Sequence, residues 1–256
     1  MPTTKDEVTA KLVEVIQLPF EEKGFTLQRK CFFEREDVYG NLLQYEINLS
    51  RLKGYNSLHL RLHILNKPLL KKVNVILEKA LRDESYVFPD NWSEKDIEYS
   101  IKLRTSSYHI CGLTDWRVLK DDDKPLEDFN KRFAIWMRSF DDIDVEFKDW
   151  KEQMRLSVEL AEKWFVAPNI NRISELAERK PPDKEFIIAN TIYPALYLLK
   201  EEKRFDELEK RYSEIFESTT RYLREVESKN AKNKITMVVS TNAAEELELF
   251  YKYLMM

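Results

Sequence analysis

The chain has 256 residues, a formal net charge of -4 and only four glycines, all within its first 112 residues. Phosphate-binding loops and nucleophile elbows need clustered glycines, so the sequence excludes those classes of enzyme. The mild negative charge gives no general reason to expect nucleic acid or an anionic membrane as a partner.

The two cysteines, Cys31 and Cys111, are far apart and form no CxxC pattern, which is typical of reduced cysteines in a cytosolic protein. The first residues lack the apolar segment of a signal peptide. No apolar run approaches the roughly 20 residues needed to span a bilayer. We therefore expect a cytoplasmic protein without a membrane segment, and no motif predicts a cofactor.

The first expected element is a helix. Thr4 and Glu7 form a capping-box pattern ahead of apolar residues at helical spacing. Gly24 marks the end of this helix. Pro19 lacks a backbone N–H and is expected to kink the helix or to end it one turn early.

Alternation of apolar and polar residues then predicts extended segments with one helix between them. The helix covers about residues 68–82, where apolar side chains recur on one face. The β content is expected to end at Gly112. The expected strands are 25–34, 42–49, 57–64, 97–103 and a short one at 108–113.

From residue 123 onward the pattern is helical, with a break at Pro181-Pro182. The expected helical segments are 126–140, 147–165, 184–201, 204–227 and 243–254, of which 184–201 and 204–227 form an antiparallel pair. The segment 235–239 fits either a helix or a strand. The sequence thus predicts an α+β fold, with an antiparallel sheet of four or five strands backed by helices and an all-helical C-terminal region. The expected domains are 1–122 and 123–256, which could also pack as one unit.

Three stretches, 18–25, 32–35 and 44–51, resemble an uncharacterised bacterial family, a domain of unknown function that opens with a helix, a Gly-Phe pair and a β-meander. The resemblance covers about residues 8–115. It implies an α+β domain with no established activity, so it transfers no catalytic residue. The helical C-terminal part lies outside it.

Polar side chains alternate with leucines in the segment 57–64. Because side chains alternate across a strand, its histidines and arginine share one face. If the predicted strands are neighbours, one polar face holds His59, Arg61, His63, Lys102 and Arg104, with Glu46 as an ion-pair partner. Such a face could bind an anion or a partner, or it could be the solvated side of a one-faced antiparallel sheet.

A metal site is not expected there. His59 and His63 would lie about 13 Å apart along a strand, whereas zinc ligands lie about 2 Å from the metal, and the charge of Arg61 between them repels a cation. His109 and Cys111 would lie about 6.6 Å apart along their strand, too far for a hydrogen-bonded nucleophile pair. No catalytic or metal-binding residue is therefore predicted.

These patterns predict a non-enzymatic cytoplasmic binding protein with a protein partner, of which an immunity- or antitoxin-like protein is one form. The expected helix pair could present a groove to such a partner. Two alternatives stay open. One is an enzyme that acts on an anionic small molecule at the polar sheet face, and the other is a structural subunit of an oligomer. The sequence does not give the oligomeric state.

Overall fold

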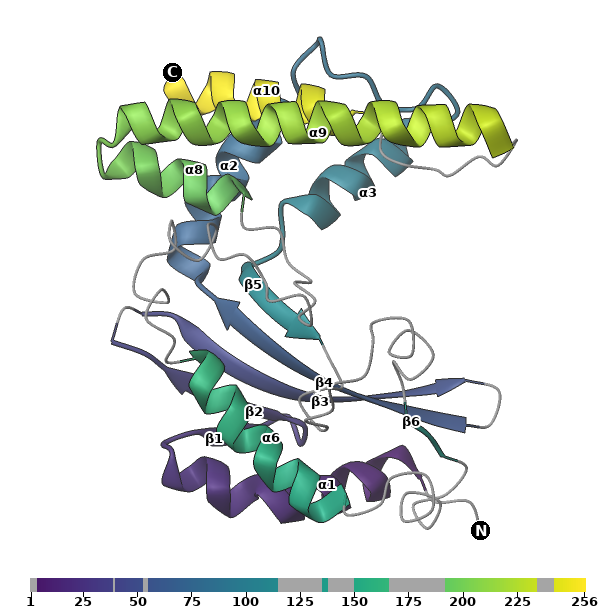
Figure 1. The fold of residues 1–256 in the computed structure, drawn as a ribbon, viewed down its shortest axis with the longest axis vertical. Helices are drawn as coiled ribbons and strands as arrows, with labels where there is room; N and C mark the ends of the chain where they lie inside the picture. Colours follow the sequence, from purple (N-terminus) through teal and green to yellow (C-terminus); the bar gives the residue numbers. More distant parts are fainter. Residues whose placement is uncertain are drawn as a thin grey trace. The chain divides into compact units, whose positions relative to one another are not determined.

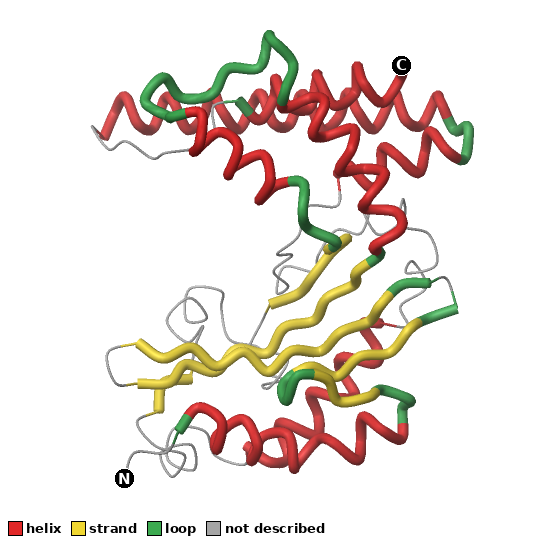
Figure 2. The backbone as a smooth tube through the Cα atoms, turned by 180° about the vertical axis from the view of Figure 1, so that it is seen from behind, coloured by secondary structure: helices red, strands yellow, loops and turns green. Residues whose placement is uncertain are grey.

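The computed structural model describes residues 4–38, 40–52, 55–114, 135–137, 150–165, 192–233 and 242–256. In these residues the protein is α+β, with an antiparallel sheet and C-terminal helices, as the sequence predicts (Figures 1 and 2). The chain forms two compact units, each made of two separated stretches. The first unit comprises Met1–Asn66 and His109–Asn190, and the second comprises Lys67–Tyr108 and Thr191–Met256. The expected domain boundary after residue 122 lies outside the described residues.

The first unit contains the sheet. Its strands follow the order β1-β2-β3-β4-β5, and all neighbours are antiparallel. Strand β6 pairs with Asn56–Leu58 near the start of β4, whereas β5 pairs with Arg61–Leu65 near its end. The elements of this unit are α1 (Lys5–Glu22), β1 (Thr26–Gln28), β2 (Phe32–Glu36), β3 (Leu42–Leu52), β4 (Tyr55–Leu65), β5 (His109–Thr114), β6 (Ile135–Met137) and α6 (Trp150–Phe165).

Two sequence expectations for the strands are wrong. The segment 25–34 is a hairpin of β1 and β2 rather than one strand, and Arg29 and Lys30 in its turn have positive φ of 48° and 66°. The β content does not end at Gly112, because β5 continues to Thr114 and β6 lies further along the chain. A strand of three residues is too short to show an alternating pattern.

Helix α1 begins as expected and ends just before Gly24, as the glycine predicts. The Glu7 N–H donates to the Thr4 hydroxyl at 3.3 Å, and the Thr4 N–H donates to the Glu7 carboxylate at 2.7 Å, which completes the capping box. The helix continues through Pro19 to Glu22, so the proline does not end it. Gly24 follows with φ 79°, a conformation that favours glycine.

The apolar face of the sheet packs against α1 and α6 (Figure 1). Aromatic rings dominate this core: Phe20 stacks on Phe33 with ring centroids 4.6 Å apart and contacts Tyr45 at 4.7 Å. The Tyr45 hydroxyl lies 2.7 Å from the hydroxyl of Ser157 on α6. This hydrogen bond gives the buried Tyr45 hydroxyl a partner inside the core.

The second unit is helical in the residues described. Helix α10 packs against α2, α8 and α9, and α8 and α9 form the antiparallel pair that the sequence predicts (Figure 1). Its elements are α2 (Lys67–Leu81), α3 (Glu94–Arg104), α8 (Ile192–Glu201), α9 (Phe205–Asn233) and α10 (Ala243–Met255). The helix expected at 126–140 is wrong at Ile135–Met137, which form strand β6, because a three-residue segment takes its structure from pairing with β4 rather than from its own pattern. The rest of that expectation, and those for 184–191 and 235–239, fall outside the described residues.

The expected strand at 97–103 is wrong, because these residues belong to helix α3. Ser93 caps the helix and forms a capping box with Asp96. Ile101 is buried, but Tyr99 and Leu103 are 68% and 61% exposed, so the alternation of apolar residues does not mark a buried sheet face. The Ser-x-x-Asp pattern was the signal for a helix start.

Among the described residues, no helix is long and apolar enough to cross a membrane.

Candidate functional site

The strand register brings four of the six expected site residues onto one face of the sheet. Glu46 on β3 lies opposite Arg61 on β4, and His63 lies two residues further along β4. His59 shares this face and lies opposite Asn48. We call the side chains of Gln44, Glu46, Asn48, His59, Arg61, His63 and His109 the polar face.

Glu46 is the centre of the polar face. Its Oε2 lies 3.0 Å from His63 Nε2 and 3.9 Å from Arg61 Nη1, and its Oε1 accepts a hydrogen bond from Asn48 at 2.9 Å. Burial alone would raise the pKa of this carboxyl, but the hydrogen bonds from His63 and Asn48 and the charge of Arg61 outweigh burial and lower it. The carboxylate is therefore charged, and His63 Nε2 donates to it.

The polar face is not simply a solvated surface. His63 is only 5% exposed, and Gln44 is buried and donates to Glu34 at 2.6 Å. His59 and Arg61 are half-buried. A one-faced antiparallel sheet normally turns such residues to water, so burial distinguishes this face from an ordinary outer face.

Two nitrogens of the polar face lack a hydrogen-bond partner in the described part of the chain. They are His63 Nδ1 and Arg61 Nε, and both atoms are buried. A buried polar group left without a partner costs about 1–3 kcal/mol, so such groups need an explanation. A bound group that hydrogen-bonds to both nitrogens would remove this cost.

His109 joins the polar face from β5, which sequence reasoning did not expect. Its ring meets the His63 ring edge to face with centroids 4.7 Å apart. An irregularity in the β4–β5 register pairs His109 with Leu65. Burial lowers the pKa of His109, with a further contribution from His63, and burial together with the charge of Arg61 lowers the pKa of His59. Both rings thus favour the neutral form. Only the strand pairing, which the sequence does not state, reveals the contact.

The remaining two expected site residues, Lys102 and Arg104, lie on helix α3 of the second unit rather than on a strand of the sheet. Arg104 donates to the Tyr86 hydroxyl at 3.2 Å and forms an ion pair with the buried Glu246. Glu246 also accepts a hydrogen bond from Tyr193 at 2.7 Å. Arg104 therefore holds α3 to its own unit.

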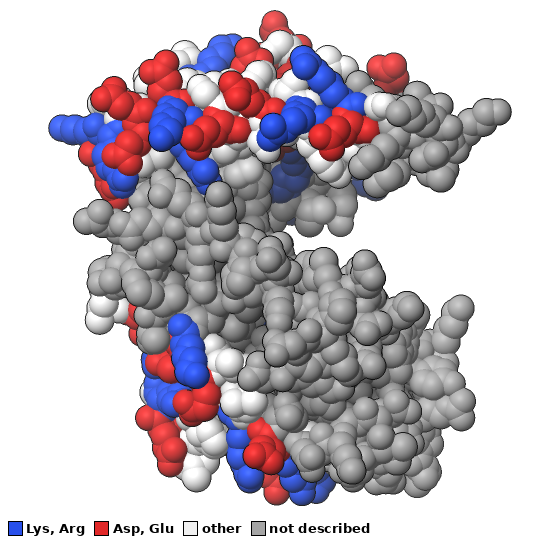
Figure 3. Space-filling model, viewed as in Figure 1, with Lys and Arg blue, Asp and Glu red and all other residues white. Residues whose placement is uncertain are grey.

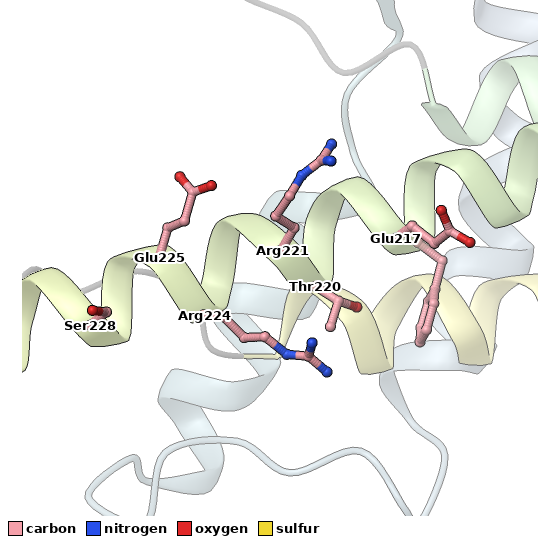
Figure 4. A pocket seen from close by; sticks show the side chains of 7 residues that line it. Glu217, Thr220, Arg221, Arg224, Glu225 and Ser228 are labelled. Atoms are coloured by element: carbon pink, nitrogen blue, oxygen red, sulfur yellow. The ribbon is translucent and has the colours of Figure 1, made fainter.

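Apart from the polar face, a pocket with a volume of about 790 Å³ lies along α9 in the second unit. Figure 4 shows Thr220 and Arg224 on one side of the helix and Arg221 and Glu225 on another. All its described lining residues belong to α9, and its two arginines are matched by two glutamates. Figure 3 likewise shows basic and acidic side chains interspersed over the described residues of this face, without the basic stripe of a nucleic-acid site.

In the described ranges, no group of three or more His, Cys, Asp or Glu residues could hold a metal ion.

No family model, curated protein or solved structure matches the chain. The resemblance to a bacterial domain family stays a prediction.

Proposed function

We propose that this chain is a cytoplasmic binding protein without a reaction of its own, and that its polar face binds an acid group, a carboxylate or a phosphate. The observation that carries the proposal is the pair of buried, unpartnered nitrogens, Arg61 Nε and His63 Nδ1, in the described part of the chain. They stand on the same face of β4, beside a carboxylate whose own hydrogen bonds are already made.

The chemistry of the two nitrogens favours an acceptor-rich group. Arg61 Nε is always a donor. His63 Nε2 donates to Glu46, so Nδ1 accepts an O–H of the acid group when the ring is neutral and donates to an oxygen of that group when the ring is doubly protonated. Residues two apart on a strand are about 6.6 Å apart, a span that one acid group can bridge with hydrogen bonds of about 2.8 Å.

The acid group can come from two sources. A protein partner, as in an immunity- or antitoxin-like role, would present it on an acidic or phosphorylated side chain, whereas a metabolite would present it free. The burial of His63 favours one narrow group over a broad contact, since stable protein interfaces cover about 800 Å² per partner. An enzyme would need, in addition, a reacting group beside His63.

Titration with inorganic phosphate and with acetate, followed by NMR of the histidine side chains, tests the proposal. We expect the His63 ring signals to shift and saturate, and Arg61→Gln to weaken the binding about tenfold through loss of a charged hydrogen bond. Arg155→Gln is the matched control, because Arg155 is exposed on α6 against the opposite face. Shifts that do not saturate, or that Arg61→Gln leaves unchanged, would overturn the proposal.

If the wild type saturates with either anion, capture of a partner from lysate by the wild type but not by Arg61→Gln would identify a protein as the source. Stable self-association of the pure protein would favour the structural-subunit alternative instead.

A further inference from the structure

A pocket of about 700 Å³ lies in the first unit, where α1, the β1–β2 turn and the edge of β3 meet. The pairing of β2 with β3 begins at Phe32, opposite Glu46, so the next residues of β3 border the pocket instead of a strand. This volume is within the range of about 300–1,000 Å³ that is typical of small-molecule sites. We call it the α1 pocket.

Part of its wall is apolar and comes from three different elements. The apolar lining residues are Ala10, Val13, Leu27, Ile47 and Leu49. Val13, Ile47 and Leu49 are nearly fully buried and belong to the core of the first unit, so this part of the wall is fixed by packing. It offers a hydrophobic surface to the body of a ligand.

The acidic residues at the pocket are already engaged. Asp6 forms an ion pair with Lys30 at 3.2 Å, Glu7 caps α1, and Glu46 belongs to the polar face. Glu14 lies 3.9 Å from Lys11 on the same helix.

Two of the three basic side chains at the pocket form no ion pair with a described residue. Lys5 and Arg29 have no ion-pair partner among the described residues, and Arg29 lies over the Phe32 ring at 5.5 Å. The Cys31 thiol adds no charge, because burial and then the Glu46 charge raise its pKa. The lining as a whole has four acidic and three basic side chains, so Lys5 and Arg29 provide a local positive position rather than a net positive charge.

The turn that carries Arg29 supports a role beyond folding. Arg29 and Lys30 occupy successive positions with positive φ in the three-residue connection between β1 and β2, and such positions in hairpins favour Gly, Asn and Asp. Side chains with a Cβ are disfavoured there, so two long basic residues are not explained by the needs of the turn.

We propose that the α1 pocket binds an amphipathic organic acid, with an aliphatic or aromatic body on the apolar wall and one carboxylate between Lys5 and Arg29. Glu46 and Asn48 border both sites, but the two proposals use different binding groups. The α1 pocket uses Lys5, Arg29 and the side of β3 that carries Ile47 and Leu49, whereas the acid group of the proposed function binds at Arg61 and His63.

Calorimetric titration with octanoate, with 1-octanol and with acetate tests this inference. We expect saturable binding of octanoate, binding of octanol about tenfold weaker, and no binding of acetate at this site. The variant Lys5→Gln/Arg29→Gln should weaken octanoate about five- to tenfold and leave octanol unchanged, since it removes charge and keeps the apolar wall.

Lys71→Gln/Lys72→Gln is the matched control, because it removes the same charge from exposed residues outside the lining. Ala10→Phe should abolish binding of both long-chain probes by filling the pocket, with thermal unfolding to verify its fold. Failure of octanoate to bind, equal affinity for octanoate and octanol, or no effect of the Lys5/Arg29 double variant would each overturn the inference. Arg61→Gln should leave octanoate binding unchanged, so the two proposals can fail separately.

Discussion

The two faces of the sheet come from the same strands and differ in the side chains that fill them. On the face toward α1 and α6, aromatic rings fill the core, and its buried hydroxyl, that of Tyr45, is paired with Ser157. On the polar face, Asn48, Arg61 and His63 surround the Glu46 carboxylate, and His63 and Arg61 each have a buried nitrogen without a partner in the residues described. The comparison indicates that the first face supplies stability and that the second is arranged for something else.

The largest effect should come from the apolar face. Phe33→Ala removes a fully buried ring that stacks on Phe20, so we expect the free energy of unfolding to fall by about 3–5 kcal/mol. Urea denaturation measures this, with Phe32→Ala as the matched control, because Phe32 is the next residue, is half-buried and points to the other face. Similar losses of stability in both variants would contradict the conclusion that the apolar face supplies most of the stability.

A smaller loss is expected from the centre of the polar face. Glu46→Gln removes the carboxylate that accepts from His63 and Asn48, so the free energy of unfolding at pH 7 should fall by about 1–3 kcal/mol. Because the pKa of Glu46 is lowered in the folded state, its contribution is present above the ordinary value of 4.5 and is lost as the pH falls through the folded value. A deficit that did not shrink as the pH falls below 4.5 would contradict this account.

Tyr45→Phe tests whether the polar pair of the core face is structural. The change removes one hydroxyl and keeps the ring, and Ser157 still donates to the Met154 carbonyl at 2.6 Å. We expect a loss of about 0.5–1.5 kcal/mol in thermal or urea unfolding. Phosphate binding at the polar face should be unchanged, and a change in that binding would mean that the two faces are coupled.

The smallest effect concerns pH. Burial lowers the pKa of His109 below its ordinary 6.5, so the unfolded chain binds its proton more readily than the folded protein. The stability that depends on neutral His109 is present above about pH 6.5 and is lost as the pH falls. In His109→Gln, unfolding measured between pH 8 and pH 5 should show a shallower decline than in the wild type. An unchanged decline would show that His109 does not contribute to it.

The centre of the polar face could be predicted from the sequence because its residues lie on strands with a regular alternating pattern. Glu46, Arg61 and His63 alternate with apolar residues on two long strands that follow one another in the chain. Consecutive strands separated by a short turn usually pair. The ion-pair role of Glu46 followed from these two facts.

Other features could not be predicted, for specific reasons. The β1–β2 turn uses Arg29 and Lys30 in place of Asn and Gly, so it carries no turn signal. In α3 a chance alternation of apolar residues concealed the capping pattern that begins at Ser93. The meeting of His63 with His109 depends on a register irregularity, and the α1 pocket depends on where β2 stops pairing with β3.

The pairing of β4 with β5 has a consequence for the order of assembly. Leu65 pairs with His109, so residues 66–108, which include α2 and α3, form a long connection between the neighbouring strands β4 and β5. Only residues 53 and 54 separate β3 from β4. Closing a longer loop costs more chain entropy, and contacts distant in sequence form more slowly. We therefore expect β3 and β4 to associate early and His109 to reach His63 late, so that the polar face is completed only when most of the first unit has already folded.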